Sequence, residues 1–288
     1  MSGYGTRCCA SCGGNFSKDS FSGNQWRKGV GQSRCHACVE GGGGGGTDPP
    51  TPEVSRADQT ARRNNATGAT FTQYDLDHPF AEGGFRWVAK GTYTNGVRNG
   101  EPCVCKWFKT GHVDQASFFD LDIKAMDKAH DLVREWNNRN LINKLVMVNI
   151  PEVWTFTATS GHVSGKRVLQ EPFINDYQKF NSNTGWADSE TPWPRVMQAL
   201  SHFSYHVSAG QFVLCDLQGG VYSNAVVLTD PVILSRGKLY GVTDLGPRGI
   251  SSFFSNHRCN EFCNSSWSRP ADQTRYHRPQ MGTSMAGF

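Results

Sequence analysis

A run of six glycines, Gly41 to Gly46, is the feature that most constrains how this chain can fold. A glycine segment buries no apolar surface, and the Thr-Asp-Pro-Pro-Thr-Pro sequence after it continues neither a helix nor a central strand. The polar composition extends from Glu53 to about Gly68. We therefore expect a flexible linker over residues 41–69, a small module at residues 1–40 and a larger folded domain after the linker.

The composition favours a folded intracellular protein. Of the 288 residues, 37% are hydrophobic, and 17 Phe and 8 Trp supply enough apolar surface for a sizeable core. The first residues contain no apolar run typical of a signal peptide, and no stretch of about 18 apolar residues occurs. We therefore expect no membrane contact, a cytoplasmic or nuclear location, and reduced cysteines whose clusters indicate metal binding rather than disulfides.

The module before the linker contains two Cys-x-x-Cys pairs, Cys9–Cys12 and Cys35–Cys38. Two thiolate pairs with this spacing complete the tetrahedral shell of a structural zinc ion. Because this short segment has few apolar residues, zinc binding would supply most of its folding free energy, about 10 kcal/mol or more. We therefore predict a zinc site formed by Cys9, Cys12, Cys35 and Cys38.

Two neighbours leave this ligand set partly open, because Cys8 can replace Cys9 and His36 competes, less well, with Cys35. The module also carries most of the chain's net charge of +4. Its charged residues are Arg7, Lys18, Arg27, Lys28 and Arg34 against Asp19 and Glu40. A protein or nucleic-acid partner is consistent with this charge, and a solvated basic surface without a partner is the alternative.

The hydrophobic pattern after the linker predicts an α+β domain over residues 70–265. Strands are expected at residues 85–93, 101–108, 145–149, 153–157, 166–171 and 212–215. Helices are expected at about 114–138, which has a broad apolar face, and at 194–208, which has proline in its first turn. Residues 266–288 are polar and contain proline, so we expect this tail to be poorly ordered.

Several polar residues lie where burial requires a partner. Lys106 lies in the middle of an apolar strand and needs an anion. Asp216 follows the apolar strand 212–215, so its carboxylate must be paired, coordinated or solvated, and Gln218 shares its face if the strand continues. Gly83 and Gly84 precede a strand and can direct backbone N–H groups at a phosphate, although a glycine pair alone more often marks a turn.

These residue types suit phosphoryl transfer. That reaction requires a cation on the phosphates, oxygen ligands for Mg²⁺ and a group that orients the acceptor hydroxyl. Lys106, Asp216 and Gln218 are of the required types. Asp230 directly precedes Pro231, and taken alone it is more simply a turn residue.

A second metal-binding pattern occurs near the end of the domain. His257, Cys259 and Cys263 are three potential zinc ligands within seven residues. A closed site needs a fourth ligand from elsewhere, and His202 and His206 on the helix 194–208 are both candidates that spacing alone does not separate. The alternative is a buried cysteine pair beside a surface histidine.

Three motifs in the C-terminal half occur in a distinctive order. They are Asp216-Leu217-Gln218-Gly219, Leu228-Thr229-Asp230-Pro231 and His257-Arg258-Cys259-Asn260-Glu261-Phe262-Cys263. Their order resembles the alpha-kinases, the family of elongation factor 2 kinase, myosin heavy chain kinases and channel-linked kinases. The resemblance extends upstream through residues 79–86, 105–108, 170–174 and 179–183, and so covers about Thr70 to Cys263. It implies a two-lobed atypical protein kinase fold with a structural zinc site.

The resemblance also implies roles for individual residues. Asp216 matches the catalytic aspartate, Lys106 the lysine that binds ATP phosphate, and Glu171 the residue near the adenine. Gln218 and Asp230 match the Mg²⁺ ligands. The remaining nucleotide contacts would be Gly83, Gly84, Lys179 and Asn183. The zinc ligands would be His202, His257, Cys259 and Cys263, which selects His202 over His206.

The sequence departs from the family pattern in two places. Thr243-Asp244 stand where the glycine-rich loop near the peptide site, here Gly241 to Gly249, commonly has Gly-Asn. Residues 222–227 also lengthen the segment that joins Asp216 to Asp230. The first departure bears on the choice of substrate and the second on the position of Asp230.

The N-terminal module has a resemblance of its own. Residues Cys9 to Val39, including Gln25-Trp26-Arg27-Lys28-Gly29, resemble a fungal zinc-finger module of adaptor proteins in heterochromatin and RNA silencing. This resemblance implies that the module docks onto a protein or a nucleic acid.

Together the motifs predict a protein serine/threonine kinase that uses ATP, Mg²⁺ and Zn²⁺ and acts on protein Ser/Thr. The His-Arg-Asp and Asp-Phe-Gly motifs of conventional kinases do not occur in the sequence. Two alternatives remain: a catalytically inactive pseudokinase that serves as an adaptor, and a protein whose main target is a nucleic acid bound by the basic module.

Overall fold

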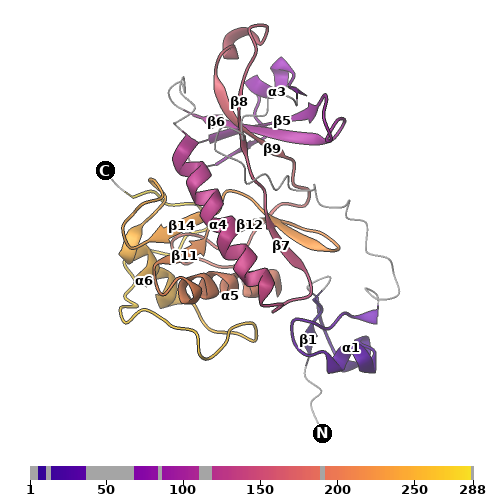
Figure 1. Ribbon diagram of the computed structural model, residues 1–288, viewed down its shortest axis with the longest axis vertical. Helices are drawn as coiled ribbons and strands as arrows, with labels where there is room; N and C mark the ends of the chain where they lie inside the picture. The colour runs from indigo at the N-terminus through magenta and orange to yellow at the C-terminus, as the bar shows by residue number, and fades with distance from the viewer. Residues whose placement is uncertain are drawn as a thin grey trace. The chain divides into compact units, whose positions relative to one another are not determined.

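The computed structural model describes residues 6–10, 14–36, 68–83, 86–109, 119–188 and 192–286 (Figure 1). Cys12, Cys38, Gly84 and most of the predicted linker lie outside these ranges. The chain forms two compact units. The strand-rich unit comprises Pro50–Lys124 and Asn149–Asn175, and the helix-containing unit comprises Met1–Pro49, Ala125–Val148 and Asp176–Phe288.

An antiparallel sheet in the order β3-β5-β6-β9-β8 forms the strand-rich unit. Its strands are β3 (Ala69–Thr70), β5 (Arg86–Tyr93), β6 (Pro102–Phe108), β8 (Glu152–Thr155) and β9 (Arg167–Pro172), and β4 (Ala81–Glu82) also pairs with β5. The short helices α3 (Gln73–Asp77) and η3 (Gly161–Val163) lie in the connections. Alternate residues such as Ala89, Cys105 and Val168 point to one face and form a small core.

A four-stranded sheet in the order β10-β12-β13-β7 and the pair β11-β14 form the helix-containing unit. Their strands are β7 (Leu145–Val148), β10 (Gln178–Lys179), β11 (Phe212–Cys215), β12 (Gln218–Val221), β13 (Ala225–Leu228) and β14 (Val232–Ser235). The helices are α4 (Asp120–Asn138), which begins in the strand-rich unit, α5 (Pro192–Val207) and α6 (Gly246–Asn256).

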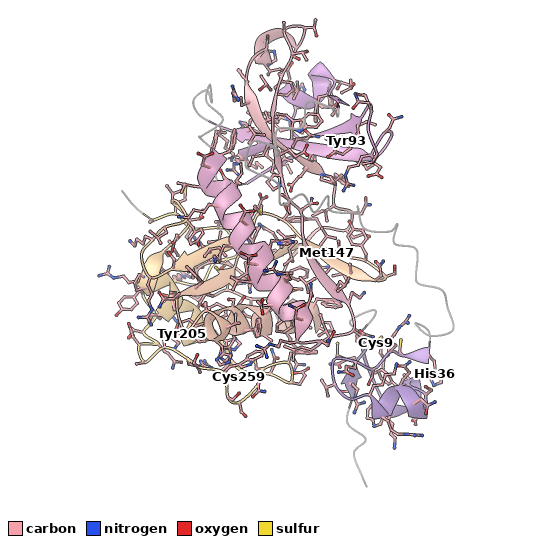
Figure 2. All side chains as sticks on the ribbon, viewed as in Figure 1. Cys9, His36, Tyr93, Met147, Tyr205 and Cys259 are labelled. Carbon is pink, nitrogen blue, oxygen red and sulfur yellow. The ribbon has the colours of Figure 1, made fainter. Side chains whose placement is uncertain are left out.

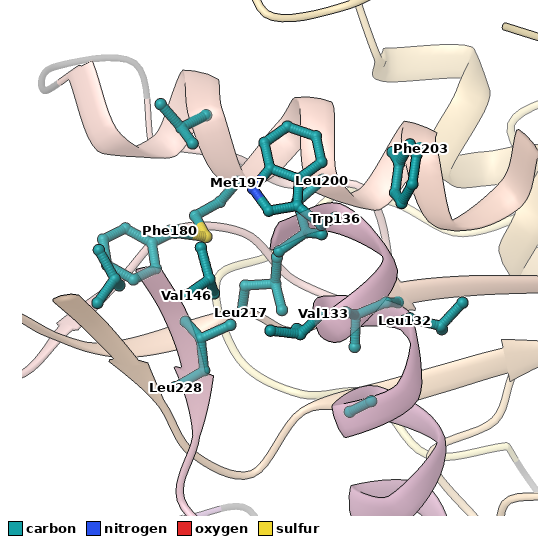
Figure 3. Close-up of a cluster of buried hydrophobic side chains, with 14 of the residues drawn as sticks. Leu132, Val133, Trp136, Val146, Phe180, Met197, Leu200, Phe203, Leu217 and Leu228 are labelled. Carbon is teal, nitrogen blue, oxygen red and sulfur yellow. The ribbon is translucent and has the colours of Figure 1, made fainter. Parts of the chain in front are cut away.

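The main core of this unit lies among α4, α5 and the four-stranded sheet (Figure 3). Trp136 of α4 meets Phe203 of α5 edge to face, with ring centroids 5.5 Å apart. Val146 and Leu228 lie on the paired strands β7 and β13 and complete the cluster. The broad apolar face expected from the sequence is therefore the buried face of α4, and it fixes the helix against the sheet.

The N-terminal residues form β1 (Arg7–Cys8), β2 (Asn15–Phe16), η1 (Lys18–Ser20) and α1 (Gly23–Arg27). Phe21, Cys9 and Cys35 form a small buried cluster within these residues. Among all described residues, no helix combines the length and apolar character needed to span a membrane.

The C-terminal segment up to Ala286 contains no helix or strand, yet it is fixed by hydrogen bonds. The backbone N–H groups of Tyr276 and His277 both donate to the Ser252 hydroxyl at 2.9 Å. The Ser251 hydroxyl donates to the Thr274 carbonyl at 2.9 Å. Side chains of α6 thus hold a polar segment whose composition gave no sign of order.

Candidate active site and metal centre

The hairpin β12–β13 places Asp230 beside Gln218. The backbone N–H of Thr229 donates to the Gln218 carbonyl at 3.0 Å, and the Gln218 side-chain amide donates to the Asp230 carbonyl at 3.4 Å. Residues 222–227, whose length departs from the family pattern, are the turn and most of β13. The β13 residues among them pair with β12 or β7, so the lengthened segment is a hairpin that extends along the sheet and then returns.

Asp216 lies at the end of β11 and is only 1% exposed. Its backbone adopts a φ of 58°, and that of Asp230 a φ of 46°, in the left-handed region that aspartate tolerates better than most residues. One carboxylate oxygen of Asp216 accepts a hydrogen bond from Lys179 Nζ at 2.8 Å. The other accepts from the Thr283 hydroxyl at 2.7 Å and from the Gln218 amide at 3.4 Å. Backbone strain of this kind concentrates at functional sites.

Burial and ion pairing act in opposite directions on the Asp216 carboxyl group. Burial is the largest cause and raises the pKa of the carboxyl group above its ordinary value. The charge and hydrogen bond of Lys179 lower this pKa, as does the Thr283 hydroxyl, while the charge of Asp230 raises it. The carboxylates of Asp216 and Asp230 repel each other and lie beside the side-chain amide of Gln218. Together they form a set of oxygens to which a cation would bind.

Lys179, the last residue of β10, and Asn183, which lies just after that strand, both reach this region. Lys179 is paired with Gln218 in the β10–β12 register, which explains why its Nζ also lies 3.1 Å from Gln218 Oε1. Asn183 is fully buried, and its amide donates to the carbonyls of Thr243 at 2.9 Å and Ser284 at 2.7 Å. The structure therefore brings Lys179, Asp216, Gln218 and Asp230 together within one unit.

Lys106 and Glu171 form a buried ion pair in the strand-rich unit. In the β6–β9 register, Glu171 lies opposite Val104, one diagonal position from Lys106 on the same face of the sheet. The anion that the buried lysine requires is therefore Glu171. The backbone N–H of Gly83 donates to the Arg86 carbonyl at 2.9 Å, and the neighbouring Gly84 lies outside the described residues.

Asp244 is turned into the protein and is 1% exposed. Its carboxylate accepts hydrogen bonds from the backbone N–H groups of Ser235 at 2.8 Å, Gly246 at 3.0 Å and Tyr240 at 3.3 Å. These bonds tie the end of β14 to the start of α6. Asp244, which departs from the family pattern, therefore stabilises the fold through these hydrogen bonds. Its position in a glycine-rich segment of the sequence did not predict this.

His202, His257, Cys259 and Cys263 converge, and their ligand atoms all lie within 4.8 Å of one another. His257 Nε2 lies 3.2 Å from His202 Nδ1, and the Cys259 and Cys263 sulfurs lie 3.8 Å from His257 Nε2. A tetrahedral zinc ion bound at about 2.0 Å to nitrogen and 2.3 Å to sulfur separates its ligand atoms by about 3.3–3.8 Å. The residues present therefore fit zinc (Cys259 is labelled in Figure 2).

The surroundings of this cluster favour the neutral, metal-binding form of its two histidines. Burial lowers the pKa of His202 to about 4 and that of His257 to about 3, so both rings are neutral at pH 7. The second ring nitrogen of His202 lies 3.1 Å from the Ser268 carbonyl, a contact that fixes the tautomer with Nδ1 facing the cluster. His206 instead contacts Ser268 beside the cluster, with its Nδ1 3.4 Å from the hydroxyl.

In the N-terminal module, the backbone N–H of Cys35 donates to the Cys9 sulfur at 3.3 Å. Cys8 is buried in the main core of the unit instead, and burial raises the pKa of its thiol to about 12. Cys9 is therefore better placed than Cys8 to share a site with Cys35. Cys12 and Cys38 lie outside the described residues, so the four-cysteine site stays a prediction.

Comparison with known proteins decides the family. The sequence profile of the alpha-kinase family matches residues 81–263. The chain belongs to the alpha-kinase family.

Curated relatives of this alpha-kinase include proteins of Dictyostelium discoideum and Caenorhabditis elegans. It is 32% identical over 191 residues to alpha-protein kinase 1 of Dictyostelium discoideum, which covers 64% of this chain and 13% of that protein. It is 33% identical over 157 residues to eukaryotic elongation factor 2 kinase of Caenorhabditis elegans, which covers 52% of this chain and 18% of that protein. The chain thus spans less than a fifth of the length of these curated relatives.

Solved alpha-kinase structures share the fold. An alpha kinase from Entamoeba histolytica superimposes with a TM-score of 0.58 at 22% identity, over 72% of this chain and 82% of that chain. The alpha-kinase domain of myosin heavy chain kinase A in complex with AMP superimposes with a TM-score of 0.56 at 22% identity, over 68% and 88%. The mixed fold of helices and sheets expected from the sequence is therefore confirmed for the kinase domain.

Proposed function

We propose that this alpha-kinase transfers the γ-phosphate of Mg-ATP to serine or threonine hydroxyls of proteins. The observation that carries the proposal is the environment of Asp216, a nearly buried carboxylate held by Lys179 and flanked by Gln218 and Asp230. Solved structures of the myosin heavy chain kinase A domain contain ATP, which supports ATP as the phosphate donor here.

In this proposal the polar residues divide the work of phosphate transfer among them. Asp216 orients the acceptor hydroxyl and accepts its proton, which its raised pKa favours. Lys179 holds the Asp216 carboxylate in place. Lys106, positioned by Glu171, binds the ATP phosphates, and the remaining nucleotide contacts are assigned to Gly83, Gly84, Glu171 and Asn183.

Gln218 and Asp230 would hold Mg²⁺, which neutralises charge on the transferred phosphate. The fit rests on side-chain oxygens, the ligands that this ion prefers, and on the repulsion between Asp216 and Asp230. We also infer that His202, His257, Cys259 and Cys263 bind a structural zinc ion, because four protein ligands leave no position for a substrate. A second zinc ion is assigned to Cys9, Cys12, Cys35 and Cys38, in a module that would dock onto a protein or a nucleic acid.

The test compares wild-type protein with Asp216→Asn, which keeps the shape of the side chain and removes its basicity. Purified proteins are incubated with Mg-ATP and a generic basic protein, and transferred phosphate is assigned to Ser, Thr or Tyr. The variant is expected to lose at least about 100-fold in rate, the usual contribution of a catalytic base. The matched control is Asp131→Asn, at an exposed carboxylate that contacts Arg134 on α4.

Equal rates for wild type and Asp216→Asn would remove the assignment. If the wild type is stabilised by Mg-ATP in a thermal-shift assay but transfers no phosphate, the inactive adaptor is the better interpretation.

A further inference from the structure

The C-terminal residues 280–286 are bound along the segment after β10 as a peptide would be. Ser284 donates its N–H to Asn183 Oδ1 at 2.9 Å, and its carbonyl accepts from Asn183 Nδ2 at 2.7 Å. Gln280 donates its N–H to the Thr184 hydroxyl at 3.1 Å, and the N–H of Ala286 donates to the Val242 carbonyl at 2.7 Å. Asn183 and Thr184 are buried, so rigid side chains hold the backbone of this segment.

This binding presents one hydroxyl to Asp216. Thr283 donates its hydroxyl to Asp216 Oδ2 at 2.7 Å, while Lys179 occupies Oδ1 of the same carboxylate. The neighbouring hydroxyl of Ser284 instead contacts the Gln280 side chain. The segment thus selects Thr283 over Ser284 for the carboxylate.

We propose that Thr283 is the chain's own phosphate acceptor, modified within the same molecule. The proposal rests on the proposed function, since it requires Asp216 to act on an acceptor hydroxyl and ATP to be the donor. A kinase acceptor must be a hydroxyl within hydrogen-bond reach of the base, and 2.7 Å meets that requirement.

The step is balanced. Thr283 Oγ1 forms a bond to the γ-phosphorus of ATP, and the bond from that phosphorus to the β,γ-bridging oxygen breaks. ADP leaves with the electron pair, and the hydroxyl proton passes to Asp216. The products are phosphothreonine and ADP.

The experiment uses the full chain with Mg-ATP over a 100-fold range of protein concentration, and a parallel reaction with an added basic protein. Trypsin cleavage after Arg275 releases a C-terminal peptide whose only Ser and Thr residues are Thr283 and Ser284, and fragmentation distinguishes these two sites. We expect phosphate on Thr283, with a first-order rate independent of protein concentration.

Variants make the assignment specific. Thr283→Val keeps the shape and removes the hydroxyl, so phosphate on this peptide should fall at least 10-fold, whereas Thr283→Ser should keep it. Thr274→Val is the matched control, because it makes the same change in the same segment, where the side chain faces Asp272, and phosphate on Thr283 should not change.

Phosphate on the added protein with none on Thr283 would overturn this proposal and leave the kinase function intact. A rate per molecule that rises in proportion to protein concentration would show transfer between molecules and overturn it too. Absence of transfer to either acceptor would overturn both proposals.

Discussion

Replacing Lys179 by methionine should lower the free energy of unfolding of the helix-containing unit, because the buried charge of Asp216 then loses its partner. The substitution keeps the length of the side chain and removes its charge. Asp216 is 1% exposed and the side chain of Lys179 is 14% exposed, so the pair is largely removed from water. Breaking a buried pair from one side costs about 3–5 kcal/mol. Because the Thr283 and Gln218 hydrogen bonds to Asp216 remain, we expect the lower end, about 3 kcal/mol at pH 8.

The pH dependence of this loss has a definite sign. Burial already raises the pKa of Asp216 in the folded protein, and removing Lys179 raises it further. The folded state then binds a proton at pH values where the unfolded state does not, so stability falls as pH rises through the folded pKa. The deficit of Lys179→Met should therefore be smaller at pH 5.5 than at pH 8.

Urea unfolding measures the effect, and about 3 kcal/mol corresponds to a midpoint shift of about 1 M or less for a protein of this size, because m increases with size. Lys179→Met combined with Asp216→Asn should recover to within about 1 kcal/mol of wild type, because no uncompensated charge remains. Arg195→Met is the control, since it breaks an exposed pair with Glu261 and should cost less than about 1 kcal/mol. If Lys179→Met costs no more than this control, or if the double variant is no better than the single one, the argument from buried charge is refuted.

Two further predictions concern zinc and the β12–β13 hairpin. Elemental analysis of the wild-type protein should find two zinc ions per chain, and Cys259→Ala and Cys9→Ala should each contain one. The control Cys103→Ala, at a buried cysteine in β6, should retain two. Unchanged zinc in Cys259→Ala would contradict the ligand assignment. Gly219→Ala should prevent stable folding, because φ is +152° and a Cβ atom would lie 1.9 Å from the Val227 carbonyl oxygen. The control Gly161→Ala, with φ of +58° and open space around it, should cost only about 1 kcal/mol. Similar urea midpoints for the two variants would be inconsistent with this difference.

Sequence patterns located most elements of the kinase domain because their apolar periods were clear. The strand expected at 212–215 is β11, and the strand expected at 101–108 is β6, which begins one residue later. The helix expected at 114–138 begins at Asp120 within the described residues, and residues 110–118 lie outside them. The buried lysine's need for an anion was also predicted, but Glu171 as that anion depends on the register of β6 with β9, which local sequence does not encode.

Helix α6 and the bound C-terminal segment were not predicted, for different physical reasons. The start of α6 contains Gly246, Pro247 and Gly249, which look like helix breakers. Pro247 is instead tolerated in the first turn, and a side chain at position 249 would meet Leu245 and Leu234, so glycine permits close packing there. The C-terminal segment buries little apolar surface and is held by hydrogen bonds to Ser252 and Asn183, which leave no periodic pattern to detect.

The separation of Asp216 from Asp230 depends on strand pairing rather than on the number of residues between them. Asp216 follows Cys215, the last residue of β11, and only Pro231 separates Asp230 from the start of β14. Cys215 is paired with Val232, so the two aspartates flank the same end of this two-stranded ladder. The β12–β13 hairpin leaves and returns at this point, and extra residues at its turn lengthen the excursion without moving its ends. A longer hairpin is therefore compatible with catalysis, whereas a one-residue slip of β11 against β14 would turn the strand faces over and move one carboxylate away from the other.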